Sequence, residues 1–187
     1  MIRAFVAVRL PEDVAGDLIA AQAGLPAGRP VAPENLHLTL AFLGEHPEPV
    51  IEDVHFGLAD FRLPSFDLAL EGLGLFGDAR PRVLYAGVRR EPELTRLREK
   101  VVQAARGAGL DPERKRYRPH VTLARFNRDL DGVDALRVRD FAGAGGGFRA
   151  GPFRVESFGL WRSFLGKSGA VYEEMAEYAL VAGPAGH

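Results

Sequence analysis

Two histidines in this sequence stand in almost the same local setting. His37 opens the string HLTLA and His120 opens the string HVTLA, so each is followed two residues later by a threonine, Thr39 or Thr122. Residues two apart on a β-strand point to the same side of a sheet. If each string is a strand, its imidazole and hydroxyl share one face and its apolar side chains share the other. This pattern is typical of a strand that lines a cavity.

Two imidazoles and two hydroxyls that meet at one point are suited to opening a phosphodiester. Imidazole titrates near neutral pH, so one histidine can accept a proton while the other donates one. Threonine hydroxyls can donate hydrogen bonds to the non-bridging oxygens, where negative charge gathers. The candidate catalytic residues are therefore His37, Thr39, His120 and Thr122. No acidic residue lies in either string to complete a metal site, so we expect no metal and no cofactor.

The surroundings of the two strings repeat as well, which the packing of a single structural histidine does not explain. Each half of the chain reads as a strand, a helix, the histidine strand, a second helix and a further strand. The first strands and helices are expected over 2–8, 12–23, 82–88 and 92–108, and the later ones over 49–60, 65–75, 130–140 and 153–161. The repeats thus span approximately 1–78 and 79–165, and a last strand is expected over 171–182.

This order predicts a single α+β domain over residues 1–187. We expect two similar lobes with antiparallel sheets and flanking helices, related by an approximate two-fold axis around a central cleft. The histidine strand of each lobe would face the other across this cleft.

Composition narrows the functional classes. The 187 residues include no cysteine, which removes disulfides, thiolate zinc sites and cysteine nucleophiles and fits a cytoplasmic protein. No apolar run approaches the roughly 18 residues of a membrane span, so we expect no membrane association. The net charge of −1 argues against a nucleic-acid binder that works through an overall positive field. Residues 111–128 nevertheless hold six basic side chains against two acids, enough for one or a few phosphates.

The two strings resemble the HxTx motifs of the 2H phosphoesterase superfamily. The wider match is to the RNA 2′,3′-cyclic phosphodiesterases, first called 2′-5′ RNA ligases, and it runs along nearly the whole chain. It is carried by IRAFVAVRLP, PENLHLTLAFLGE, PRVLYAGV, RPHVTLARF and the ending around Ser163, Gly169 and Tyr172.

The resemblance implies an enzyme that acts on RNA with a 2′,3′-cyclic phosphate terminus and hydrolyses it to a 2′-phosphate. It also allows an ATP-independent joining of RNA ends through a 2′-5′ bond. It implies that His37 is the general acid toward the leaving 3′-oxygen and that His120 is the base that activates water. The strings themselves do not distinguish these two roles. A closed two-lobed protein needs no partner subunit, so we expect a monomer.

Five residues after each histidine the halves differ, with Phe42 in the first and Arg125 in the second. The resemblance places both at the substrate, where an arginine can clamp a phosphate and an aromatic ring can stack on a terminal base. Arg118 is a third candidate, for the phosphate or the RNA backbone. In a regular strand the odd offsets would turn Phe42 and Arg125 away from the cleft, so a bulge or strand end must intervene. The alternatives are a core position for Phe42 and a purely solvent-exposed role for Arg118.

Two other functions fit the same residues. A catalytically silent module that binds RNA ends would use the cleft, Arg125 and Phe42 without turnover. The presence of both histidines and both threonines counts against this interpretation. A phosphodiesterase for a small cyclic nucleotide, or for an ADP-ribose cyclic phosphate, would use the same catalytic groups on a different substrate.

Overall fold

The computed structural model describes residues 1–77, 80–112, 117–127, 130–166 and 169–183. The helices are α1 (Glu12–Gln22), α2 (Glu48–Ala59), α3 (Pro92–Gly107) and α4 (Gly132–Ala144), with short 3₁₀ turns η1 (Pro33–Asn35) and η2 (Gly145–Gly147). The strands are β1 (Ile2–Arg9), β2 (Arg29–Pro30), β3 (His37–His46), β4 (Phe66–Phe76), β5 (Val83–Val88), β6 (His120–Arg125), β7 (Arg149–Val155), β8 (Ser157–Gly166) and β9 (Gly169–Ala179). None of the described helices is both long enough and apolar enough to cross a membrane.

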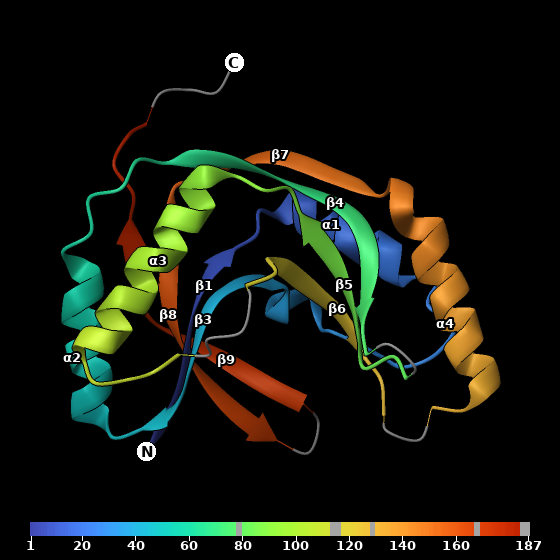
Figure 1. Cartoon of the computed structure of the whole chain (residues 1–187), viewed down its shortest axis with the longest axis horizontal. Helices are drawn as coiled ribbons and strands as arrows, with labels where there is room; N and C mark the ends of the chain where they lie inside the picture. Colours follow the sequence, from blue (N-terminus) through green and yellow to red (C-terminus); the bar gives the residue numbers. More distant parts are fainter. Residues whose placement is uncertain (78–79, 113–116, 128–129, 167–168, 184–187) are drawn as a thin grey trace.

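Over the described residues the nine strands form one antiparallel sheet in the order β7-β4-β5-β6-β3-β1-β8-β9, with β2 paired to β6. The predicted α+β fold, with antiparallel strands and flanking helices, is confirmed (Figure 1). The two lobes share this sheet instead of each having its own. The histidine strands β3 and β6 lie side by side at its centre, joined through the single residue pair Leu38–Val121.

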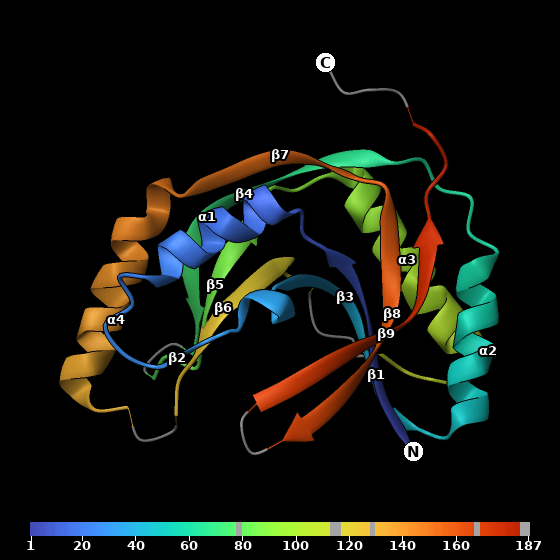
Figure 2. The same ribbon diagram turned by 180° about the vertical axis from the view of Figure 1, so that it is seen from behind.

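The two halves of the chain exchange elements across this centre. From the first half, β4 pairs with β5, and from the second half, β8 pairs with β1. Helix α1 packs against β6 and β7, whereas α3 packs against β3 and α2. Figures 1 and 2 show α2 and α3 together at one end of the sheet and α1 and α4 at the other. Each lobe is therefore built from both halves of the chain.

The prediction of a single strand over 153–161 is wrong. It is two strands, because β7 ends at Val155 and β8 begins at Ser157, and these lie at opposite ends of the sheet. The apolar run looks continuous in the sequence because both pieces are half-buried strands. The chain passes from one lobe to the other at the exposed Glu156 between them.

The helices cover one face of the sheet and leave the polar face of the central strands open. On α3 the buried side chains recur every three or four residues, at Leu94, Leu97, Val101 and Ala105. They pack in the same core as Leu38 of β3, which is fully buried. The faces of β3 and β6 that carry the histidines are half-buried by comparison.

Candidate active site

Strand β3 breaks its alternation just after its polar pair. His37 and Thr39 are half-buried on one face, but Leu40 and Ala41 are buried in succession. Successive residues of β1 pair with Thr39 and Ala41, so Leu40 is an extra residue in the ladder. Such a bulge inverts the alternation that follows. It places Phe42 on the face of His37.

Strand β6 has the same irregularity at the equivalent place. His120 and Thr122 are partly exposed, Leu123 and Ala124 are both buried, and the register with β5 skips Leu123. The bulge turns Arg125, which is exposed, to the face of His120. The irregularity that the odd offsets required is therefore present in both strands. It brings the predicted residues of each motif onto one surface.

Both imidazoles are held by the same backbone hydrogen bond. The Nδ1 atom of His37 lies 2.7 Å from the carbonyl oxygen of Asn35, and the Nδ1 atom of His120 lies 2.7 Å from that of Arg118. A carbonyl oxygen only accepts, so each Nδ1 carries the proton and donates it. The Nε2 atom of each ring is left for chemistry, as an acceptor when the ring is neutral and as a donor when it is charged.

Aromatic rings enclose the His37 imidazole. Its ring centroid lies 4.9 Å from that of Phe5 on β1 and 5.3 Å from that of Tyr172 on β9. Asn35, whose carbonyl holds His37, also donates its side-chain Nδ2 to the carbonyl oxygen of Ala170 at 2.8 Å. The β8–β9 hairpin is thereby fixed to the segment that orients His37.

His120 has a matching enclosure from the other lobe. Its ring centroid lies 4.8 Å from that of Phe76 on β4 and 5.6 Å from that of Tyr85 on β5. Arg118 lies over both of these rings, at 5.2 Å and 6.0 Å, and donates a hydrogen bond to the Tyr85 hydroxyl at 3.1 Å. Arg118 is therefore part of the surroundings of His120 and not only a solvated side chain.

Burial lowers the pKa of both histidines from the ordinary value of 6.5. The backbone hydrogen bond of each ring opposes this shift, and the Arg125 guanidinium lowers both pKa values further. The pKa of His120 is also lowered by Arg118. Both shifts favour the neutral form of the imidazoles in the free protein. A bound phosphate anion favours the charged form and can restore a proton to one of them.

The threonine hydroxyls are free to meet a ligand. Neither the Thr39 nor the Thr122 hydroxyl makes a hydrogen bond with another described residue. The backbone of Thr39 is fixed instead, because the Tyr117 hydroxyl donates to its carbonyl oxygen at 2.9 Å. The two hydroxyls can therefore donate to phosphate oxygens without breaking a hydrogen bond to a described residue.

Phe42 is not a core residue, contrary to the alternative considered from the sequence. Its side chain is 46 % exposed, and the Arg3 guanidinium lies 4.7 Å from its ring centroid. The ring stands on the polar face of β3 because of the bulge at Leu40. Its exposure leaves surface for a stacking partner.

Among the residues with described positions, no group of three His, Cys, Asp or Glu side chains could hold a metal ion. Part of the basic stretch expected to hold phosphates, residues 113–116 and 128, lies outside the described residues. Arg118 and Arg125 are its described members nearest the histidines.

Sequence reasoning did not identify the aromatic rings as site residues. Phe5, Phe76, Tyr85 and Tyr172 lie on four strands that are widely separated in sequence from the histidine they touch. No spacing within one strand reveals such a contact. The available clue was that the strands adjacent to the histidine strands, β1 and β5, each carry an aromatic residue, Phe5 or Tyr85.

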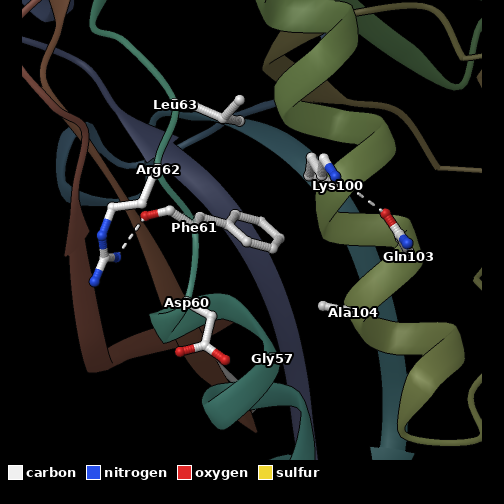
Figure 3. Close-up of a pocket in the computed structure, with 8 residues that line it drawn as sticks. All are labelled: Gly57, Asp60, Phe61, Arg62, Leu63, Lys100, Gln103 and Ala104. Carbon is white, nitrogen blue, oxygen red and sulfur yellow. Dashed lines mark hydrogen bonds between the residues drawn. The ribbon is translucent and has the colours of Figure 1, made fainter.

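Two of the surface hollows formed by the described residues adjoin α3. A groove of 960 Å³ opens beside His120, between the end of β5, the start of α3 and residues 117–119. A smaller pocket of 430 Å³ lies between α2 and α3, where Phe61, Lys100 and Gln103 are among its lining residues (Figure 3). The smaller pocket contains none of the candidate catalytic or substrate-binding residues.

Comparisons with known proteins agree with this arrangement. A family described as LigT-like phosphoesterase matches residues 8–85 and again residues 87–172, so the two halves each match it. An RNA 2′,3′-cyclic phosphodiesterase of Aeropyrum pernix is 37 % identical over 161 residues, which cover 84 % of this chain and 88 % of that protein. One of Escherichia coli is 31 % identical over 182 residues, covering 95 % and 96 %.

Solved structures show the same fold. The crystal structure of Escherichia coli LigT complexed with 3′-AMP matches with a TM-score of 0.77 and 28 % identity, covering 96 % of this chain and 98 % of that one. A crystal structure of a Thermus thermophilus protein matches with a TM-score of 0.78 and 30 % identity, covering 97 % and 99 %.

Proposed function

The chain belongs to the LigT-like phosphoesterase family, so it is a hydrolase, and we propose that it opens the 2′,3′-cyclic phosphate at the end of an RNA strand to leave a 2′-phosphate. The observation that carries this proposal is the matched pair of imidazoles. Both have Nδ1 tied to a backbone carbonyl, and both stand with a threonine on the open face of the central strands beside Arg125.

The proposed reaction is a displacement at phosphorus with one histidine on each side. The Nε2 atom of His120 takes a proton from water as the water oxygen bonds to phosphorus. The bond from phosphorus to the 3′-oxygen breaks, and the Nε2–H of charged His37 gives its proton to that oxygen. Thr39, Thr122 and Arg125 donate hydrogen bonds to the phosphate oxygens as charge builds there.

The charges around the two rings support His120 as the base. Arg118 and Arg125 both lower its pKa, which keeps it neutral and able to accept a proton. The pKa of His37 is lowered by Arg125 and by His120, and Arg118 is not among the causes. Phosphate binding raises the pKa of His37 and supplies the acid.

The other groups fit an RNA end. Phe42 offers an exposed ring on which the terminal base can stack, and Arg118 can reach the phosphate or the neighbouring backbone. If an RNA 5′-hydroxyl replaces water, the same steps join two ends through a 2′-5′ bond. Both histidines come from one chain, so we propose that a monomer is active.

The test is turnover of a short RNA that ends in a 2′,3′-cyclic phosphate, with EDTA present. We expect conversion to a 2′-phosphate, and we expect His37→Ala and His120→Ala each to lower kcat by about 10²–10⁴-fold. Binding of this RNA without product would favour the silent end-binding module. Rapid turnover of a small cyclic nucleotide with none on RNA would favour a small-molecule phosphodiesterase.

A further inference from the structure

The groove adjoins residues that surround His120, although His120 itself does not line it. Tyr85 and Arg118 line the groove, and both also contact the surroundings of His120 directly. Gly87, the residue of β5 that pairs with His120, lines it too. Its volume of 960 Å³ lies in the range of about 300–1,000 Å³ typical of ligand sites. A strand attached to the reacting phosphate can therefore continue into it.

Two arginines along the groove have no acidic partner among the described residues. Arg98 lies over the ring of Tyr117 at 4.4 Å, and its Nε atom is buried without a hydrogen-bond partner. Arg90 is exposed and makes no ion pair with a described residue. The guanidinium of Arg98 is held over the Tyr117 ring and donates to no described residue, so it is suited to an anion.

The acids of the groove do not cancel these charges. Glu91 is engaged by Arg89, with Nε and Oε1 2.9 Å apart. Glu99 is exposed and makes no ion pair with a described residue. With Arg90, Arg98 and Arg118 on the same walls, the lining has a positive excess. Arginines interleaved with tyrosine rings are the combination that binds single-stranded nucleic acid through both phosphate and base.

We propose that this groove binds one further nucleotide of single-stranded RNA next to the reacting phosphate, with Arg98 and Arg90 on its phosphate. The inference rests on the proposed function and adds a preference for oligonucleotide over mononucleotide substrates. The strand can come from the substrate itself, continuing from its terminal nucleotide. It can also be a second RNA end that approaches on the His120 side.

The experiment compares uridine 2′,3′-cyclic phosphate with a trinucleotide that ends in a 2′,3′-cyclic phosphate. We expect Arg98→Gln and Arg90→Gln each to lower kcat/KM for the trinucleotide about tenfold more than for the mononucleotide, as expected for one charge-assisted hydrogen bond. Arg96→Gln is the matched control, because Arg96 is exposed on the same helix and does not line the groove. Thermal unfolding checks that each variant is folded.

A second experiment distinguishes whether the RNA in the groove belongs to the substrate or to a second RNA end. A trinucleotide with a 5′-hydroxyl and no cyclic phosphate is added as an inhibitor of mononucleotide hydrolysis. If only this inhibition weakens in the Arg98 and Arg90 variants, the groove holds a second strand. If the substrate preference changes, it holds the substrate's own strand. If neither measurement differs from that of the Arg96 control, the proposal is overturned.

A binding measurement keeps this result apart from failure of the proposed function. Anisotropy of a trinucleotide with a 2′-phosphate end and a 5′ fluorophore reports binding without turnover. We expect about tenfold weaker binding in Arg98→Gln than in Arg96→Gln. An inactive wild-type protein that still shows this difference would refute the hydrolysis and retain the groove. Equal binding in both variants would refute the groove.

Discussion

The surroundings of His37 and of His120 share one set of features and differ in another. Shared are the Nδ1 bond of 2.7 Å to a carbonyl two residues earlier, the threonine two residues later and the bulge beyond it. They differ in charge. Arg9, which pairs in register with His37, is held by Glu174 at 2.6 Å, whereas Arg118 beside His120 has no described acidic partner.

The comparison separates the groups that are present at both histidines from the charge that is present at only one of them. The proposed displacement uses one oriented imidazole and one threonine hydroxyl on each side of phosphorus, and the fold supplies this set in duplicate. The proposed acid and base, however, must start the reaction in different protonation states. Arg118 lowers the pKa of His120 and is not among the causes that lower the pKa of His37. The symmetric features thus supply the groups, and the proposed assignment of roles depends on this asymmetry.

Removing a hydroxyl tests the shared features, and its effect is expected to be larger than those of the Phe42 and Arg118 variants below. Thr39→Val and Thr122→Val should each lower kcat about 100-fold, because each removes one donor to the developing charge on the phosphate. The two losses should be similar. Single-turnover rates on the cyclic-phosphate RNA measure them. A large loss in one variant and none in the other would show that the hydroxyls are not equivalent.

The residue beyond the bulge differs between the two strands, because it is Phe42 in β3 and Arg125 in β6. Substitution of Phe42 tests this difference. Phe42→Ala should raise KM for the RNA about tenfold, because stacking on a base contributes about 1–3 kcal/mol. Phe42→Tyr keeps an aromatic ring and should retain most of the affinity. The comparison is made by steady-state kinetics with a single terminal base. Equal KM values for the alanine and tyrosine variants would remove Phe42 from the substrate site.

Neutralising Arg118 tests the difference in charge between the two surroundings. Its effect is the smallest, a few-fold change in kcat/KM near pH 6. Arg118 lowers the pKa of His120, so Arg118→Gln raises it. If His120 is the base, it must be neutral, and the acidic limb of kcat/KM moves to higher pH. If it is the acid, the alkaline limb moves instead.

The control for that profile is Arg9→Gln. Arg9 is engaged by Glu174 and is not among the charges that lower the pKa of His37, so neither limb should move. The profiles are measured on uridine 2′,3′-cyclic phosphate, which does not extend into the groove beside His120. A shift in the Arg9 variant equal to that in the Arg118 variant would abolish the proposed distinction.

Much of the fold followed from local pattern, because it depends on contacts within one element. The His-x-Thr spacing predicted the polar face of β3 and β6, and the odd offsets of Phe42 and Arg125 required the bulges that are present. The placing of these side chains on one face was therefore predictable. Their catalytic and binding roles stay predictions.

Contacts between distant strands were not predictable in this way. The exchange of β4 and β8 between lobes depends on which edges the helices leave open, and no local spacing records it. The same holds for the rings of Tyr172 and Phe76 against the histidines. The break at Glu156 was missed because one polar residue between two apolar runs resembles ordinary alternation.

The pairing of β1 with β8 has a consequence for the synthesis of the chain. Ala4 pairs with Arg162, so strand β1 gains its second neighbour only after the chain has been translated as far as β8. Contacts so distant in sequence form slowly. Until β8 pairs with β1, one edge of β1 is unpaired. A product that stops before Arg162 cannot close the sheet. The His37 side of the site, which depends on β9 for Tyr172, is therefore completed last.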